Sequence, residues 1–203
     1  IVDASGYHLI LLAKNPKGYE NLCKIVSTAW IDGNYYRPRI DKELLEAHKE
    51  GLIVCSACLG GEIPQHIIAG RLDEAEKSIM WFKERFGEDY YLEIQRHKTD
   101  KPNADQNVYQ RQKQVNKVIL ELAEKTNTKV IATNDVHFVE EEHAEAHDRL
   151  ICLSTGKDLD DPNRMRYTKQ EWLKTPEEMA EIFADVPEAL ANTMEIADKV
   201  EVY

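Results

Sequence analysis

The sequence contains no apolar run approaching the ~18–20 residues that a membrane-spanning helix needs. No signal-peptide pattern opens it, because residues 1–6 lead straight into a strand-like segment. The four cysteines are irregularly spaced and form no disulfide framework, which favours a reducing cytoplasm. Positive charge is scarce, with 26 Lys and Arg against 37 Asp and Glu and a formal net charge of −11. Such a surface is not expected to grip nucleic acid by itself.

The sequence also has no Gly-rich phosphate loop, no Gly-x-Ser-x-Gly elbow and no dinucleotide fingerprint. What it has is an ordinary globular composition, with 42% hydrophobic and 31% charged residues among 203. That length suits one domain, or one domain with a small appendage. The chain lacks an initiator Met and begins in the middle of a pattern, so we expect a fragment of a longer protein.

Four short apolar runs, each followed by a helical pattern, predict an α/β fold. The runs cover residues 8–13, 52–56, 90–94 and 129–133. Helices are predicted up to residue 31 after a turn and cap at 15–18, and over 41–48, 62–69, 72–86, 106–126, 140–154, 175–184 and 187–200. Continuous apolar runs are typical of parallel strands buried on both faces, so a largely parallel sheet is expected. Chemistry in such folds collects at the carboxyl ends of the strands.

The segment Asp135-Val136-His137 follows the fourth run and is the best local signal of a site. Extended residues two apart point to the same face, so the carboxylate and the imidazole can converge on one ion. These donors suit zinc, manganese or iron, although Asp-x-His is a common pattern and, taken alone, is more often a polar loop after a strand. His8, Cys58 and residues 93–97 also lie beside strand-like runs. His8, however, stands at the start of its run, which is the wrong end of a strand for a shared site.

Two further patterns have simpler explanations. Cys55 and Cys58 lack the second cysteine pair of a zinc ribbon, so Cys55 is expected in the core and unligated, while Cys58 stays free for another role. His143 and His147 are four apart on a predicted helix, which is metal-ligand spacing. Because acidic residues precede them, a solvated helix start is the default interpretation.

Several motifs in the same order resemble the bacterial replicative DNA polymerase III alpha subunits. They occupy residues 8–15, 18–22, 56–64 (Ser56-Ala57-Cys58-Leu59-Gly60-Gly61-Glu62-Ile63-Pro64), 91–97, 132–137 (Ala132-Thr133-Asn134-Asp135-Val136-His137), 177–179 and 183–193. The resemblance covers essentially the whole chain. It implies a polymerase-and-histidinol-phosphatase (PHP) domain, an irregular (β/α)7 barrel whose strand ends bind a metal cluster. It places a truncated PHP domain at 1–155 and a helical connector towards the polymerase palm at 156–203.

The resemblance implies four metal ligands here, namely His8, Cys58, Asp135 and His137. It assigns His8 to the site although the residue precedes its strand. The family's first segment, with a His-x-His pair, a further His and a Glu ligand, would precede Ile1, so the barrel is expected to lack its first strands. The polymerase's catalytic aspartates would follow Tyr203. The implied cofactor is a divalent metal at the PHP site, Zn or Mn, with Mg in the parent polymerase site.

The resemblance implies a parent that performs DNA-directed DNA synthesis, with DNA, deoxynucleotides and replisome subunits, including the proofreading subunit, as partners. We expect the fragment itself to be cytoplasmic, not bound to membranes, and inactive alone, with the PHP site linked to 3′–5′ exonuclease proofreading. An open sheet edge left by the missing strands predicts self-association. The alternatives are a free-standing PHP phosphoesterase and a non-catalytic module that docks the proofreading subunit.

Overall fold

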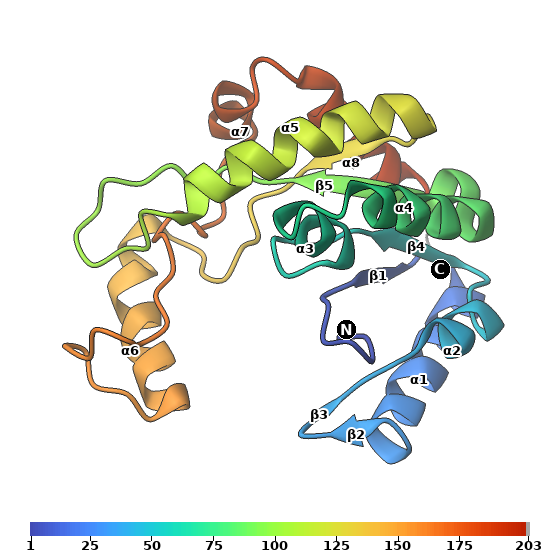
Figure 1. Ribbon diagram of the computed structural model, residues 1–203, viewed down its shortest axis with the longest axis horizontal. Helices are drawn as coiled ribbons and strands as arrows, with labels where there is room; N and C mark the ends of the chain where they lie inside the picture. Colours follow the sequence, from blue (N-terminus) through green and yellow to red (C-terminus); the bar gives the residue numbers. More distant parts are fainter. Residues whose placement is uncertain (202–203) are drawn as a thin grey trace.

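The structure is a computed structural model that describes residues 1–201. Its centre is a four-stranded sheet in the order β1-β4-β5-β6, with β1 (Ile10–Ala13), β4 (Leu52–Cys55), β5 (Tyr90–Ile94) and β6 (Val130–Ala132). A two-stranded hairpin, β2 (Asn34–Tyr35) and β3 (Arg37–Pro38), projects from it (Figure 1). The α/β prediction is confirmed, as are the four predicted strands to within a few residues at their ends.

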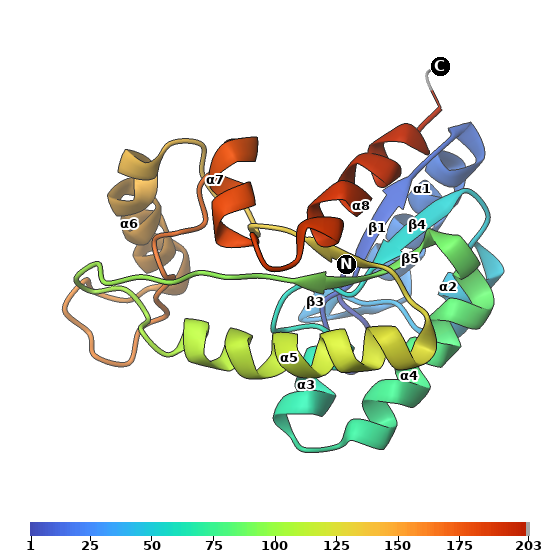
Figure 2. The ribbon, with the colours of Figure 1, turned by 90° about the horizontal axis from the view of Figure 1, so that it is seen from above.

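Eight α-helices and two 3-10 turns connect these strands within residues 1–201. They are α1 (Pro16–Ile31), α2 (Lys42–Ala47), α3 (Glu62–Ile68), α4 (Leu72–Phe86), η1 (Gly87–Asp89), α5 (Val108–Thr126), η2 (Glu141–His143), α6 (Ala144–Thr155), α7 (Pro176–Ile182) and α8 (Pro187–Asp198). Helices α3, α4 and α5 lie on one side of the central strands and α8 on the other (Figure 2). None of the helices in this part of the chain combines the length and apolar composition needed to cross a membrane.

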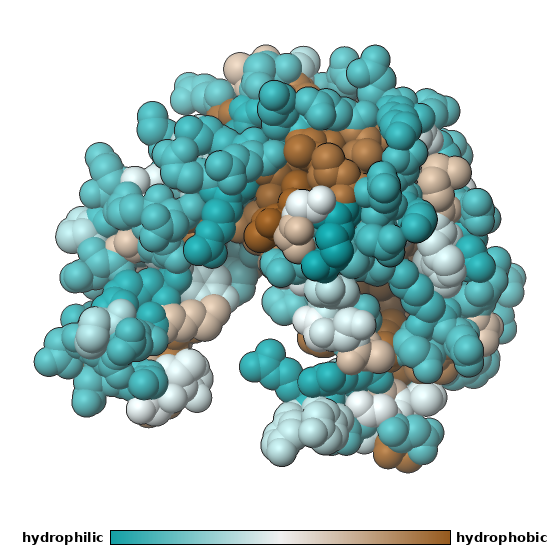
Figure 3. All heavy atoms as spheres, in the orientation of Figure 1, coloured by the Kyte–Doolittle hydropathy of each residue, from teal (hydrophilic) through white to brown (hydrophobic). Residues whose placement is uncertain are grey.

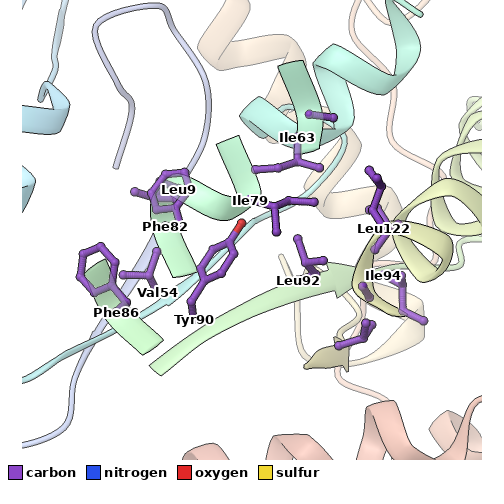
Figure 4. Packing of buried hydrophobic residues seen from close by; sticks show 14 of the residues in the cluster. Leu9, Val54, Ile63, Ile79, Phe82, Phe86, Tyr90, Leu92, Ile94 and Leu122 are labelled. Atoms are coloured by element: carbon purple, nitrogen blue, oxygen red, sulfur yellow. The ribbon is translucent and has the colours of Figure 1, made fainter. Parts of the chain in front are cut away.

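The continuous apolar runs form two hydrophobic clusters, because successive strand residues point to opposite faces of the sheet. One face of β5, carrying Tyr90, Leu92 and Ile94, packs into the larger cluster with α4 and α5 (Figure 4). The other face carries Tyr91, which joins a smaller cluster with Ile196 of α8 packed against it. Burial on both faces is the reason that β4, β5 and β6 show no polar alternation in the sequence.

The largely parallel sheet is confirmed for β4, β5 and β6, but the first strand runs the other way. β4 pairs parallel with β5, and β5 pairs parallel with β6. β1 instead pairs antiparallel with β4, with Ile10 opposite Cys55. The start of β1 therefore lies beside the carboxyl end of β4. This direction removes the objection that His8 precedes its strand, since His8 lies at the same edge as the ends of the parallel strands.

The C-terminal third extends away from the sheet. After β6 the chain runs out to α6, which stands apart from the sheet, and returns through a loop to α7 and α8 (Figure 1). Only the isolated bridge between Phe138 and Trp172 has strand-like pairing in this region of the described chain. A space-filling view shows an open hollow between the α6 arm and the hairpin end of the molecule (Figure 3). The prediction that no further strand follows residue 133 is confirmed within residues 134–201.

Candidate metal centre

A cavity of about 270 Å³ lies at the carboxyl ends of β4, β5 and β6. All four predicted ligands line it: His8, Cys58, Asp135 and His137. The wall also contains His97, which follows β5, and residues 165–168 of the returning loop. The four predicted ligands, up to 129 positions apart in the sequence, thus share one cavity because three strands end, and one begins, at the same edge of the sheet.

Cys58 is presented by a tight turn directly after β4. Ala57 adopts a left-handed backbone with φ of 62°, which is uncommon for a residue other than glycine. The Ala57 N–H donates to Glu93 Oε2 at 3.0 Å, and Gly61 N–H donates to the Cys58 carbonyl at 2.8 Å. A Cβ on Gly61 would lie 2.1 Å from the Ser56 carbonyl oxygen, so this turn requires glycine. The strained backbone aims the Cys58 thiol at the cavity.

His8 and Cys58 are in direct contact. His8 Nδ1 lies 3.5 Å from Cys58 Sγ, and the His8 N–H donates to the Gly60 carbonyl at 2.9 Å. Burial, with a smaller contribution from the negative charge of Asp135, raises the pKa of the Cys58 thiol. The thiol is therefore protonated at neutral pH in the protein as it stands, and a cation would have to displace that proton to bind sulfur.

Asp135 and His137 form the second half of the site. Asp135 also has a left-handed backbone, with φ of 46°, so the chain turns sharply after β6. The Nδ1–H of His137 donates to the Asp135 carbonyl at 2.6 Å. In the neutral imidazole this contact fixes the tautomer and leaves Nε2 with its lone pair. The Tyr167 hydroxyl lies 3.2 Å from that nitrogen.

Buried polar side chains support the floor of the cavity. His97 is buried, and its backbone N–H donates to Gln112 Oε1 at 2.7 Å. Its Nδ1 accepts from Gln112 Nε2 at 3.0 Å, and its Nε2–H donates to the Asn134 carbonyl at 3.0 Å. Burial lowers the pKa of His97 and raises that of the buried carboxyl of Glu93. Both His97 ring nitrogens are hydrogen-bonded to groups of the protein, so His97 helps to hold the cavity wall in place.

The two histidines of α6 have different environments. His143 Nδ1 accepts a hydrogen bond from the backbone N–H of Glu140 at 3.2 Å, so its exposed side chain takes part in the capping box at the start of η2. His147 is half-buried, with its ring centroid 5.7 Å from that of His137 and 4.9 Å from that of Tyr167. The default interpretation of a solvated helix start holds for His143 and is wrong for His147.

The donor types around the cavity suit a transition metal, since sulfur, imidazole and carboxylate are all present. Their arrangement does not by itself hold an ion. Within residues 1–201 no three His, Cys, Asp or Glu side chains are grouped closely enough to bind one metal. Cys55 is buried beside Ile53 and Tyr91, and burial raises the pKa of its thiol, in line with a core residue.

The sequence reasoning missed Tyr167, which the structure brings to His137. Tyr167 follows no strand-like run, and a lone tyrosine in a polar loop carries no local signal. The loop reaches the cavity because Arg164 makes a bidentate ion pair with Asp148 of α6, at 2.6 and 2.7 Å, with both side chains buried. The backbone N–H of Asp105 donates to the Tyr167 carbonyl at 3.0 Å.

Comparison with known proteins identifies the domain that carries this cavity. Residues 2–97 match the family described as PHP domain, a range that includes His8 and Cys58. The chain therefore carries a PHP domain, as the sequence predicted.

Curated relatives extend the similarity beyond that range. The chain is 46% identical over 196 residues to DNA polymerase III subunit alpha of Borreliella burgdorferi, covering 96% of this chain and 16% of that protein. It is 42% identical over 204 residues to the same subunit of Campylobacter jejuni, covering 95% and 16%. For Thermus aquaticus the identity is 41% over 205 residues, covering 99% and 16%. Over nearly all of its length the chain is thus similar to a segment of DNA polymerase III subunit alpha, and it spans about a sixth of these relatives' length.

Proposed function

We propose that the chain is the PHP region of the alpha subunit of a bacterial replicative DNA polymerase III. The observation that carries this proposal is the 46% identity that extends over 96% of the chain. The parent is a nucleotidyltransferase for DNA replication that extends a primer with deoxynucleotides, using Mg at its polymerase site. In the parent, residues 1–155 form the PHP domain and residues 156–203 lead towards the polymerase palm. The parent works in the cytoplasm with DNA and with replisome subunits.

The PHP region contributes part of a divalent-metal site, with Zn or Mn as the ion. His8, Cys58, Asp135 and His137 supply its donors, and their shared cavity supports this assignment. The incomplete grouping within residues 1–201 agrees with a site whose other ligands come from the His-x-His segment that the resemblance places before Ile1. A bound metal would supply Lewis-acid chemistry there, in association with 3′–5′ exonuclease proofreading.

The metal site is tested by metal analysis. We expect the 203-residue chain to bind Zn²⁺ or Mn²⁺ weakly, and His137→Ala to lower that binding. His143→Ala, on the neighbouring helix and outside the cavity lining, is the matched control and should bind as the wild type does. In the full-length alpha subunit, the difference in metal binding between His137→Ala and His143→Ala should be larger, because that chain includes the additional ligands. Equal metal content in His137→Ala and wild type would refute the site.

The chain alone is expected to be inert both as polymerase and as nuclease. None of the palm carboxylates that the resemblance implies falls within it, and the partial donor set loses both coordination and preorganisation. The net charge of −11 further discourages the approach of DNA. The assay supplies primed DNA, deoxynucleotides and Mg²⁺, and separately single-stranded DNA with Zn²⁺ or Mn²⁺. Primer extension, or 3′-end trimming that His137→Ala abolishes, would overturn this expectation.

A second candidate role is a non-catalytic module that stabilises the polymerase and docks the proofreading subunit. The acidic balance of the chain, with a net charge of −11, is compatible with this role, since a docking surface need not contact DNA. Binding of the purified proofreading subunit, measured by titration calorimetry, tests this role. An affinity that is equal for wild type and His137→Ala supports docking without metal. No binding in either case would exclude docking through this chain.

A further inference from the structure

Only Nε2 of His137 could bind a metal ion, because Nδ1 is hydrogen-bonded to the Asp135 carbonyl. In the structure, the Tyr167 hydroxyl is hydrogen-bonded to this Nε2. In the neutral imidazole, whose Nδ1–H donates to the Asp135 carbonyl, Nε2 can only accept a hydrogen bond. The Tyr167 hydroxyl, 3.2 Å from Nε2, is therefore the donor in this pair. The lone pair that would bind a cation is used in an internal hydrogen bond.

A cation and this hydroxyl cannot use the same lone pair at once. Imidazole nitrogens bind zinc at about 2.0–2.1 Å. An ion at that distance on the line from Nε2 to the hydroxyl would lie only about 1.1 Å from the oxygen, since the two atoms are 3.2 Å apart. That is roughly half of any metal–oxygen bond length. The hydroxyl must leave before His137 can bind metal.

The backbone around Tyr167 is held in place, so the movement is confined to its side chain. The Tyr167 carbonyl accepts from Asp105 N–H at 3.0 Å, and the next residue, Thr168, is buried with its N–H donating to Glu171 Oε1 at 3.0 Å. The Tyr167 ring is half-buried and packs against the rings of both His137 and His147, with centroid distances of 4.7 and 4.9 Å. Rotation of the ring would open Nε2 while the loop stays anchored.

We propose that Tyr167 is a gate on the metal site, which holds His137 in its metal-free form and must rotate away before His137 binds a divalent cation. This inference rests on the metal site of the proposed function.

The first test compares metal affinity in wild type and Tyr167→Phe, with Zn²⁺ measured by chelator competition and Mn²⁺ by electron paramagnetic resonance. Phenylalanine keeps the ring packing and removes only the hydroxyl. We expect Tyr167→Phe to bind about two- to tenfold more tightly, the range set by loss of one competing neutral hydrogen bond. Tyr19→Phe, on the exposed part of α1, is the matched control and should bind as wild type does. Unchanged or weaker binding in Tyr167→Phe overturns the gate.

A second measurement needs no metal. The ¹⁵N resonance of His137 Nε2, assigned by its loss in His137→Ala, should shift downfield in Tyr167→Phe, because the nitrogen loses a hydrogen-bond donor. An unchanged resonance overturns the gate whatever the metal data show. If His137→Ala binds metal as wild type does, the metal site itself is refuted. If binding depends on His137 but not on the Tyr167 hydroxyl, only the gate is refuted.

Discussion

Two neighbouring tyrosines on β5 have hydroxyl groups in opposite environments. Tyr90 is 1% exposed, its ring stacks on Phe82 at 5.1 Å between centroids, and it lies among core residues (Figure 4). Its hydroxyl has no hydrogen-bond partner within residues 1–201. The Tyr91 hydroxyl points to the other face, donates to Glu195 Oε1 at 2.7 Å and accepts from Lys199 Nζ at 2.7 Å.

Removing each hydroxyl should therefore change stability in opposite directions. Burial of an unpaired hydroxyl costs roughly 1–3 kcal/mol in proteins. Tyr90→Phe removes that cost and keeps the ring in place, while the small void left by the oxygen offsets part of the gain. We expect a net stabilisation of about 1 kcal/mol. Tyr91→Phe instead loses two hydrogen bonds to charged groups near the surface, and we expect a destabilisation of about 1–2 kcal/mol.

Thermal denaturation followed by circular dichroism measures both variants. For a chain of this length, 1 kcal/mol corresponds to roughly 2–4 °C in Tm. Tyr90→Phe should raise Tm by that amount and Tyr91→Phe should lower it. A fall in stability of more than about 1 kcal/mol in Tyr90→Phe would show that the hydroxyl has a partner, and the reasoning from its isolation would be wrong.

Three further predictions follow from other parts of the molecule. Asp148→Asn should cost about 3–5 kcal/mol in denaturant titration, because it leaves the buried Arg164 guanidinium without its bidentate partner; a loss below 1 kcal/mol would contradict this. Ion pairing with Lys129 lowers the pKa of Glu195 from 4.5 to about 2, so its stabilisation is complete above pH ~5 and lost as pH falls towards 2. Glu195→Gln should flatten stability between pH 5 and 2, by roughly 1 kcal/mol at most because the carboxylate is partly exposed, and an identical pH profile would refute the assignment. The edge strand β1 exposes Ile10, so concentration-dependent self-association in sedimentation velocity should weaken in Ile10→Lys; a monomer at all concentrations would exclude this contact.

The sequence alone determined the elements and their order. Residues 90–94 were predicted as a strand and form β5 with the same bounds, because an apolar run buried on both faces has no competing periodicity. The helices were predicted from the spacing of their apolar residues. The C-terminal third was predicted to contain no strand because it has no further apolar run. The hairpin of β2 and β3 was missed, since its residues are largely exposed and Tyr36 turns with a φ of 59°. Hydrophobic periodicity along the chain does not predict such turns.

The candidate site was determined in part. The residue types at His8, Cys58, Asp135 and His137 were picked out by motif, and the tertiary structure puts all four on one cavity. Whether they bind a metal stays a prediction. The direction of β1 could not be read locally, because an apolar run looks the same in parallel and antiparallel pairing.

Only the tertiary structure decided which side chains contact each candidate metal ligand. Tyr167 reaches His137 across 30 residues because the loop that carries it is anchored to α6 by the Asp148–Arg164 pair. Neither contact leaves a periodic trace in the sequence, since long-range hydrogen bonds depend on where the chain returns and not on neighbouring residues. The sequence by itself thus determined which groups could serve a site, and the packing of strands and loops decided which atoms meet there.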